Sequence, residues 1–562
     1  MKQFSPRWAW LSPPSEHLKV FANTNPSVWQ NKTIGELARE HAERQPDVSV
    51  FPNLDGDWRF ARLLQDADAL VFSLQEMGLR PGDVISFQTP NWAEAAVINL
   101  AAALGGFVVN PIVIIYRHAE VKLMLQDCRA KVLFISEQFG KFDFVGMVED
   151  IKPDLPDLQH VAFVRSNRPG NYQQLVDAGH GQTPHRPVID PNDVKLLLYT
   201  SGTTGRPKAV LHSHNTLARA VVCSGKHWQI RPGDHFLMPS PVTHVSGYGN
   251  GLELPFLCDT RTVLMESWNK DAAVELINKY QIAGTVAATP FLQELTQAAK
   301  AHDTDLASLR YFACGGAAVP SEIVYQANQQ FANTCVFRVF GSSEAPLVTL
   351  GFQGDATADL AATTDGEIVD YEVRLVDEDG QPLASGEEGE IEVRGPAMFM
   401  GYADKQDTMD ALTVDGFFKT GDIGFILQDA ASGRALCISG RKKDLIIRGG
   451  ENISAKEIED VLHLHEGIQE AAVVAMPHER LGEGICAYII MANKVAKDDA
   501  KDDAKDEAET IADLLAHIAG SGLAKQKTPE RFIFTDDFPR TASGKIRKDL
   551  LRKDIADMMA NK

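Results

Sequence analysis

Between about residue 33 and Val348 the chain alternates between helical patterns and short apolar runs, and this alternation limits the possible folds most strongly. The stretch IGELAREHAERQ has apolar residues at helical spacing, whereas DVISFQ and AKVLFIS have the length and composition of buried strands. Repeated helix–strand units favour layers of helices on largely parallel sheets. The sequence therefore predicts an α/β fold for a large N-terminal domain.

The pattern changes twice further along the chain. Between residues 366 and 424, YEVRLVDEDGQPL and GEIEVRG are typical of antiparallel strands with Asp-Gly turns, which predicts a small β-rich subdomain. After GRKKD, one helical stretch (AKEIEDVLHLH) and two strand-like stretches (QEAAVVAMP, GICAYIIMA) predict a compact α+β domain. We therefore expect an N-terminal domain over 1–440 and a smaller C-terminal domain over 441–562.

Bulk properties exclude several classes of protein. The 562 residues carry a net charge of −21, which argues against a nucleic-acid-binding protein because such binding depends on cationic contacts to phosphate. The seven cysteines form no CxxC pair and are interpreted as reduced, buried thiols of a cytoplasmic protein. The first residues lack an apolar core of signal-peptide length.

One long apolar run and one charged repeat stand out from the rest of the chain. The run AAVINLAAALGGFVVNPIVIIY is nearly long enough to span a membrane, but Asn99, Gly105, Gly106, Asn110 and Pro111 interrupt it. A buried helix ending near the two glycines, followed by a core strand, fits better than an integral membrane segment. The charged repeat over 496–510 is interpreted as a solvated helical or disordered insertion.

A loop rich in glycine and hydroxyl residues follows an apolar strand in LLLYTSGTTGRPKAVLHSH. Glycine lets a ligand approach the backbone, and hydroxyl and N–H groups together suit phosphate oxygens. The loop is not a Walker motif, because Pro207 precedes Lys208 and Ala209 follows it, whereas that motif needs Gly-Lys and then a hydroxyl residue. It is therefore a candidate phosphate loop of another kind.

Five further motifs follow this loop: CGGAAVP, VFGSSEAP, FKTGDIG, GRKKDLIIRGGENISAKEIE and PRTASGKIRKDLL. Together, and in this order, the six resemble the signatures of the adenylate-forming enzymes, a family of acyl-CoA synthetases, luciferases and peptide-synthetase adenylation domains. The resemblance covers about residues 200 to 550. It implies the two-domain fold of that family, with ATP and Mg²⁺ as ligands and coenzyme A as co-substrate.

The resemblance assigns roles to the nucleotide-binding residues. The loop and its lysine would hold the β- and γ-phosphates of ATP: Thr200, Ser201, Gly202, Thr203, Thr204, Gly205 and Lys208. The slot for adenine would be formed by Gly315, Gly316 and Ala317, with Phe340 packing on the base. In the element that continues through Gly341 and Ser342, Ser343 would contact the α-phosphate and Glu344 would hold the magnesium ion. The family usually has tyrosine and threonine where this chain has Phe340 and Ser343.

The remaining motifs concern ribose, catalysis and movement. Asp422 would accept hydrogen bonds from the ribose hydroxyls, which its two carboxylate oxygens allow, and Arg441 would contact ribose and phosphate. Lys545 matches the catalytic lysine and would bridge the substrate carboxylate and the α-phosphate. Lys443 falls at the family's interdomain hinge. After rotation of the small domain, Gly449 and Gly450 would line the pantetheine tunnel.

The acid substrate is less well defined. SPVTHVSGYG resembles the acyl-pocket segment, with His244 near the carboxylate channel, and NPIVIIYRHAEVKLML is similar to cyclohexanecarboxylate– and medium-chain fatty acyl–CoA ligases. We expect a CoA ligase for a medium-chain or alicyclic acid, with no integral membrane segment. The alternatives are an aryl-acid CoA ligase and a non-catalytic nucleotide-binding relative. A luciferase-like oxygenase is a third, and the sequence does not favour it. We see no carrier domain for a peptide synthetase, and the oligomeric state is left open.

Overall fold

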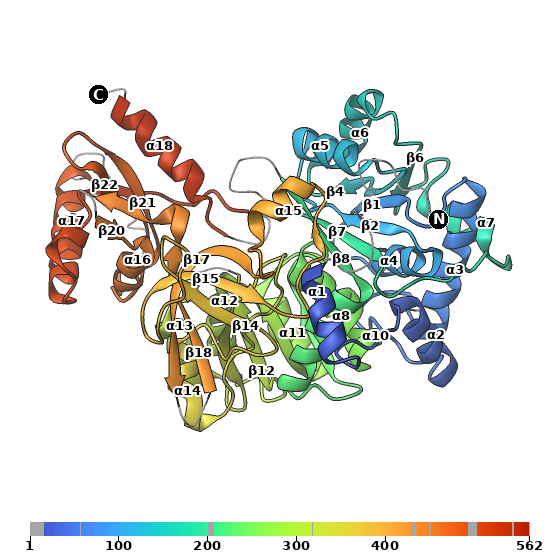
Figure 1. The fold of residues 1–562 in the computed structure, drawn as a ribbon, viewed down its shortest axis with the longest axis horizontal. Coiled ribbons are helices and arrows are strands. Elements are labelled where there is room, and N and C mark those ends of the chain that lie inside the picture. The colour runs from blue at the N-terminus through green and yellow to red at the C-terminus, as the bar shows by residue number, and fades with distance from the viewer. Residues whose placement is uncertain are drawn as a thin grey trace.

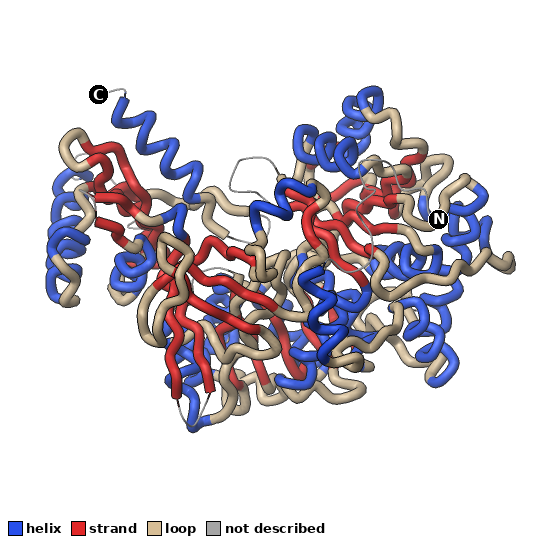
Figure 2. The backbone as a smooth tube through the Cα atoms, in the orientation of Figure 1, coloured by secondary structure: helices blue, strands red, loops and turns tan. Residues whose placement is uncertain are grey.

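A computed structural model describes residues 16–56, 58–200, 207–316, 319–429, 433–448, 451–492, 503–541 and 545–560. Figure 1 shows a large body that carries the N-terminal part of the chain and a smaller lobe that carries the C-terminal part. Figure 2 shows that both parts combine sheets with helices, as the predicted α/β fold requires. Within the described residues, no helix has the length and apolarity needed to cross a membrane.

The first sheet of the large body has seven strands, in the order β16-β8-β7-β2-β1-β3-β6. The central strands β7, β2, β1, β3 and β6 are parallel, whereas β8 is antiparallel to β7 and β16 is antiparallel to β8. The strands are β1 (Val84–Gln88), β2 (Val108–Pro111), β3 (Val132–Ser136), β6 (His160–Val164), β7 (Val194–Thr200), β8 (Lys208–Ser213) and β16 (Gly401–Tyr402). All residues of β1, β2 and β3 are buried, and most of them are apolar, as expected of parallel strands that are covered on both faces.

Helices pack against this sheet, and the sequence accounts for their ends. Thr33 and Glu36 form a reciprocal capping box that begins α2, with Thr33 N donating to Glu36 Oε2 over 2.7 Å. Gly106 ends α4 in the left-handed conformation, with φ 71°. All thirteen residues of α4 are buried, as predicted for the apolar run, and β2 follows. The helices of this region are α1 (Glu16–Thr24), α2 (Ile34–Arg44), α3 (Phe60–Glu76), α4 (Ala93–Gly105), α5 (His118–Cys128), α6 (Phe144–Ile151), α7 (Tyr172–Gly179) and α8 (His214–His227), with a short hairpin of β4 (Gln138–Phe139) and β5 (Phe142–Asp143).

The second sheet of the large body has five strands, all parallel, in the order β10-β9-β11-β12-β13. Parallel strands end at the same edge of a sheet, where α/β proteins bind their ligands. The strands are β9 (His235–Met238), β10 (Arg261–Leu264), β11 (Ile282–Ala287), β12 (Tyr311–Gly315) and β13 (Cys335–Val339). The accompanying helices are α9 (Val245–Gly247), a π-helix η3 (Tyr248–Glu253), α10 (Leu254–Cys258), α11 (Lys270–Tyr280), α12 (Thr289–Ala301), α13 (Ser321–Gln330) and α14 (Ala358–Thr363).

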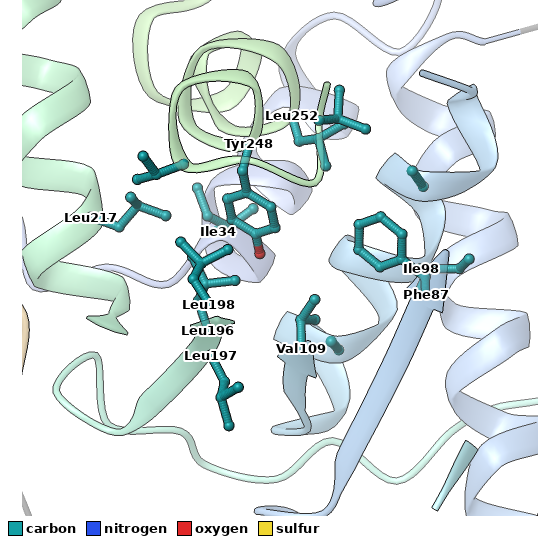
Figure 3. Packing of buried hydrophobic residues seen from close by; sticks show 14 of the residues in the cluster. Ile34, Phe87, Ile98, Val109, Leu196, Leu197, Leu198, Leu217, Tyr248 and Leu252 are labelled. Atoms are coloured by element: carbon teal, nitrogen blue, oxygen red, sulfur yellow. The ribbon is translucent and has the colours of Figure 1, made fainter. Parts of the chain in front are cut away.

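One large core of buried side chains spans both sheets. Figure 3 shows Tyr248 of η3 with Ile34 of α2, Phe87 of β1 and Leu196 of β7 in this packed interior. The hydroxyl of Tyr248, which is fully buried, donates to the side-chain oxygen of Asn99 in α4. The π-helix η3, which begins at Tyr248, is therefore attached to helix α4 of the first sheet.

A third sheet is antiparallel, in the order β14-β15-β17-β18. It consists of β14 (Glu372–Val376), β15 (Gly389–Arg394), β17 (Phe418–Asp429) and β18 (Gly433–Arg441). The predicted antiparallel strands are therefore present, but the sheet extends beyond Gly424 to Arg441. The FKTGDIG motif lies within β17. Helix α15 (Lys405–Ala411) precedes it.

The small lobe is built on a sheet in the order β20-β19-β22-β21, with β23 beside β22. Its strands are β19 (Ile446–Arg448), β20 (Glu451–Ile453), β21 (Ile468–His478), β22 (Gly482–Met491) and β23 (Arg531–Phe534), and its helices are α16 (Ala455–His463), α17 (Asp503–Gly520) and α18 (Lys548–Ala560). Two apolar clusters on this sheet form a core separate from that of the large body. Residues 503–510 of the charged insertion belong to α17, whereas 496–502 lie outside the described residues.

Candidate active site

The candidate phosphate loop connects two antiparallel strands. Thr200 ends β7 and Lys208 begins β8, and the two residues are register partners across the pair. The hairpin therefore brings the two ends of the loop together. Five predicted phosphate-binding residues lie outside the described residues, namely Ser201, Gly202, Thr203, Thr204 and Gly205.

Lys208 has two neighbours that the sequence motifs did not reveal. Its Nζ atom lies 2.9 Å from Oδ1 of Asp407 in α15 and 5.1 Å from the ring centroid of Tyr402 in β16. Both residues come to the loop because β16 pairs with β8, with Tyr402 opposite Val210. The short strand at 401–402 has no periodicity that predicts this pairing.

Glu344 lies in a buried position beside the same loop. Its Oε1 accepts a hydrogen bond of 2.8 Å from the Tyr402 hydroxyl and lies 3.5 Å from Oγ1 of Thr200. The site therefore offers hard oxygen donors at the base of the phosphate loop, which is the donor type that Mg²⁺ prefers. Among the described residues no group of three or more His, Cys, Asp or Glu forms a metal cage. A single carboxylate fits Mg²⁺, since this ion is usually held by one or two carboxylates, water and substrate phosphates.

The residues before Glu344 follow the end of β13 and are held by local hydrogen bonds. Oγ of Ser342 accepts from Ala345 N over 3.1 Å, and the carbonyl of Ser343 lies 2.7 Å from Nε2 of His212. Burial lowers the pKa of His212 to about 4, so its ring is neutral and donates through Nε2. A Cβ on Gly341 would lie 2.4 Å from a backbone nitrogen, which leaves room only for glycine.

Phe340 and the predicted adenine slot follow neighbouring parallel strands. Gly315 in β12 is the register partner of Val339 in β13, and Phe340 comes directly after Val339. A Cβ on Gly315 would lie 2.4 Å from the carbonyl oxygen of Val339, and Gly316 has φ 86°. Both positions therefore require glycine. Ala317 lies outside the described residues.

Asp422 and Arg441 face each other across the antiparallel pair β17–β18. They are register partners, and Nε of Arg441 lies 3.1 Å from Oδ1 of Asp422. Burial raises the pKa of Asp422, while the guanidinium of Arg441 opposes this change. The sequence placed these two residues in separate motifs, and only the sheet brings them together.

Lys545 comes from the small lobe and reaches this site. A Cβ on Gly316 would lie 3.8 Å from its Cε atom, which places the lysine side chain beside the predicted adenine slot. Its backbone is held by Thr541, whose N–H donates to the Lys545 carbonyl over 2.7 Å. Burial lowers the pKa of Lys545 to about 8, Arg441 acts in the same direction, and the carboxylates of Asp422 and Glu344 oppose the shift.

His244 also belongs to this group of side chains. It precedes α9, and its carbonyl accepts from Tyr248 N over 2.7 Å. Burial and, second, the charge of Lys545 lower the pKa of His244 to about 4, so the ring is neutral near pH 7. The structure thus brings His244, Glu344, Asp422, Arg441 and Lys545 into one site.

The connection between the lobes contains Lys443. It lies in a short 3-10 turn, η5 (Lys442–Asp444), between β18 of the large body and β19 of the small lobe. Burial lowers its pKa, and neighbouring Arg441 adds to this effect. Gly449 and Gly450 lie outside the described residues.

Fold and site thus define a two-lobed protein in which a lysine of the small lobe lies close to two carboxylates of the large body. The chain belongs to the AMP-binding enzyme family: residues 38–403 match the AMP-binding enzyme domain and residues 457–545 match the AMP-binding enzyme C-terminal domain.

Three known proteins illustrate the similarity. The medium-chain fatty-acid–CoA ligase of Escherichia coli (strain K12) is 32% identical over 538 residues, which cover 94% of this chain and 91% of that protein. The vibriobactin-specific 2,3-dihydroxybenzoate–AMP ligase of Vibrio cholerae is 30% identical, with 93% and 94% covered. The crystal structure of ATP-bound MatB from Rhodopseudomonas palustris superposes with a TM-score of 0.79 at 26% identity, covering 94% of this chain and 100% of that one.

Proposed function

We propose that the protein is an ATP-dependent carboxylate–CoA ligase. In the first step the substrate carboxylate attacks the α-phosphorus of ATP, the bond to the β-phosphate breaks, and pyrophosphate leaves. In the second step the thiol of coenzyme A attacks the acyl carbon, the thiol proton is lost, and AMP leaves. Family membership and the names of the similar proteins, among them a medium-chain fatty-acid–CoA ligase, support this reaction.

The observation that carries the proposal is the position of Lys545. The first step brings two anions together, so a cation must lie between them. The ammonium group of Lys545 enters a site that already contains Glu344 and Asp422, and both carboxylates act on its pKa. A cation held between a predicted magnesium ligand and a predicted ribose ligand is suitably placed for the α-phosphate of a nucleotide.

The other site residues have supporting roles in this proposal. Asp422, kept in position by Arg441, binds the ribose hydroxyls, and Lys208 with the loop residues binds the β- and γ-phosphates. Glu344, oriented by Tyr402, would hold Mg²⁺, whose charge would neutralise the phosphates. Neutral His244 would line the carboxylate channel without adding a charge that competes with Lys545.

The second step needs a different arrangement of the lobes. Lys545 has to leave the site so that the thiol can approach, and rotation about Lys443 in η5 would remove it and bring Gly449 and Gly450 forward. We therefore place the domain boundary at residues 440/441, at the last residue of β18 and two residues before Lys443.

We further propose a medium-chain or alicyclic carboxylic acid as the substrate. The sequence NPIVIIYRHAEVKLML and the similarity to a medium-chain fatty-acid–CoA ligase favour it. The similarity to a 2,3-dihydroxybenzoate–AMP ligase supports an aryl acid as the alternative.

The test is a panel of carboxylic acids assayed for AMP and acyl-CoA formation with ATP, Mg²⁺ and coenzyme A. We expect product with acids of medium chain length or with a saturated ring. Preference for aryl acids would support the alternative. Nucleotide binding without AMP formation from any acid would indicate a non-catalytic relative, and oxygen uptake with light emission would indicate an oxygenase.

A further inference from the structure

The lysine of the phosphate loop is already paired with a carboxylate. Asp407 places Oδ1 2.9 Å from Nζ of Lys208, and the side chain of Lys208 is only 17% exposed. An ammonium group has three N–H donors and binds phosphate as a compact point charge. A phosphate oxygen that binds the ammonium group of Lys208 therefore shares this cation with the carboxylate of Asp407.

The fold holds Asp407 in this position. Its helix α15 follows β16, and Tyr402 N donates to Oγ1 of Thr408 over 2.8 Å, which fixes the first turn of α15 to the strand. Asp404 caps the helix by accepting from Gln406 N over 2.7 Å and from Asp407 N over 3.3 Å. These hydrogen bonds hold Asp407 at the edge of the sheet next to the loop, so its position does not depend on a long surface loop.

The pair also belongs to a chain of contacts that reaches Glu344. Lys208 lies over the ring of Tyr402, whose hydroxyl donates to Oε1 of Glu344 over 2.8 Å. If the charge of Asp407 is removed, the face of the Tyr402 ring still holds Lys208 near the loop, because a ring face attracts a cation. The lysine would then have one less competing anion and would remain in place.

We propose that Asp407 is a positioning residue that competes with phosphate oxygens for Lys208 and so weakens the binding of both ATP and pyrophosphate. Its negative charge also repels a polyphosphate bound at the same cation. Asp407 thereby sets the affinity of the site low enough for pyrophosphate to leave. This inference rests on the proposed function only in taking Lys208 as a phosphate contact.

The experiment is a calorimetric titration of the full-length protein with MgATP and, separately, with magnesium pyrophosphate, at low and high ionic strength. Asp407→Asn should bind both ligands about two- to fivefold more tightly than the wild type, which is the effect expected of a partly exposed ion pair. The gain should shrink at high salt, because salt screens such charges. Asp407→Glu should restore weaker binding.

Asp410→Asn is the matched control. It removes the same charge from the same helix, but Asp410 accepts from Gln406 instead of Lys208, so it should bind like the wild type. Asp407→Ser is a second variant with the same expectation as Asp407→Asn, in case the amide disturbs folding. A merely structural role would weaken binding in these variants.

The outcomes separate the two proposals. Wild-type protein that binds MgATP, with no tightening in Asp407→Asn or Asp407→Ser, overturns the role of Asp407 and leaves the ligase proposal intact. Wild-type protein that binds neither ligand overturns both. Equal tightening in Asp410→Asn would show that only the net charge of α15 matters, which also rejects the specific contact.

Discussion

Nε of Arg441 lies 3.1 Å from Oδ1 of Asp422, and the two residues are register partners on β17 and β18. Burial raises the pKa of Asp422, and the guanidinium of Arg441 opposes this shift because it favours the ionised carboxylate. Arg441 is also the last residue of β18, and η5, which connects the two lobes, begins at the next residue.

Replacing Asp422 with Asn should raise KM for ATP by roughly tenfold or more, since hydrogen bonds to a charged group contribute about 1.5–3 kcal/mol. The amide keeps one acceptor oxygen but loses the charge that Arg441 contacts. Steady-state kinetics with varied ATP measures the effect. Asp415→Asn is the control, because Asp415 also pairs with an arginine, Arg374, but elsewhere in the same region of the chain. Unchanged KM in Asp422→Asn would reject the ribose assignment.

Replacing Lys545 with Ala should lower the rate of adenylation by about 10²–10³-fold, the cost of losing one electrostatic donor to the transition state. The same variant should still convert a supplied acyl adenylate to acyl-CoA. Pyrophosphate exchange and single-turnover thioester formation separate the two steps. The exposed Lys553 on α18 offers a control, Lys553→Ala, which should leave both unchanged. Equal loss of both steps would contradict the proposed division of labour.

The pH dependence of adenylation should report on Lys545. Its ammonium group is charged below its pKa, which burial lowers to about 8, so kcat/KM should fall about tenfold per pH unit above that value. Arginine stays charged at these pH values, so in Lys545→Arg whatever activity remains should lose this alkaline limb. His244, with a pKa of about 4, should add no limb near neutral pH. An alkaline limb that persists in Lys545→Arg would assign the titration to another group.

Replacing Lys443 with Pro should preserve pyrophosphate exchange and abolish thioester formation, because proline restricts the backbone angle that a hinge must change. Lys443→Ala is the matched control, since it removes the side chain and leaves the backbone free, and it should retain both activities. Undiminished acyl-CoA turnover in Lys443→Pro would place the hinge elsewhere.

The buried ion pair between Lys195 and Glu253 should matter for stability. Glu253 is fully buried, Lys195 donates to its Oε1, and Asn99 donates to the same oxygen over 2.9 Å. Lys195→Ala leaves a buried charge unpaired and should lower the free energy of unfolding by about 3–5 kcal/mol.

Chemical denaturation measures this loss, and the double variant Lys195→Met with Glu253→Gln should recover most of it. Lys32→Ala, which breaks the exposed pair with Glu40, should cost no more than about 1 kcal/mol. Similar losses of unfolding free energy in Lys195→Ala and Lys32→Ala would contradict the importance of burial for this ion pair.

Local patterns in the sequence were sufficient for much of the fold. The helical spacing of IGELAREHAERQ, the glycine stop of α4 and the strand-like run DVISFQ each act through neighbouring residues, and each appears as predicted. The full extent of the third sheet could not be predicted from local patterns, because β18 is recognised as part of it only through its pairing with β17. Asp407 and Tyr402 were missed for the same reason, since β16 pairs with a strand almost 200 positions earlier.

The sequence by itself determined the family, the order of the motifs and the residue types available for phosphate, ribose and metal, because these depend on short spans of chain. Only the tertiary structure decided which of these groups meet: Arg441 with Asp422, Lys208 with Asp407, and Lys545 with the carboxylates of the large body. The physical reason is that charges interact over a few ångströms of space, and sheet pairing and lobe placement set those distances independently of separation along the chain.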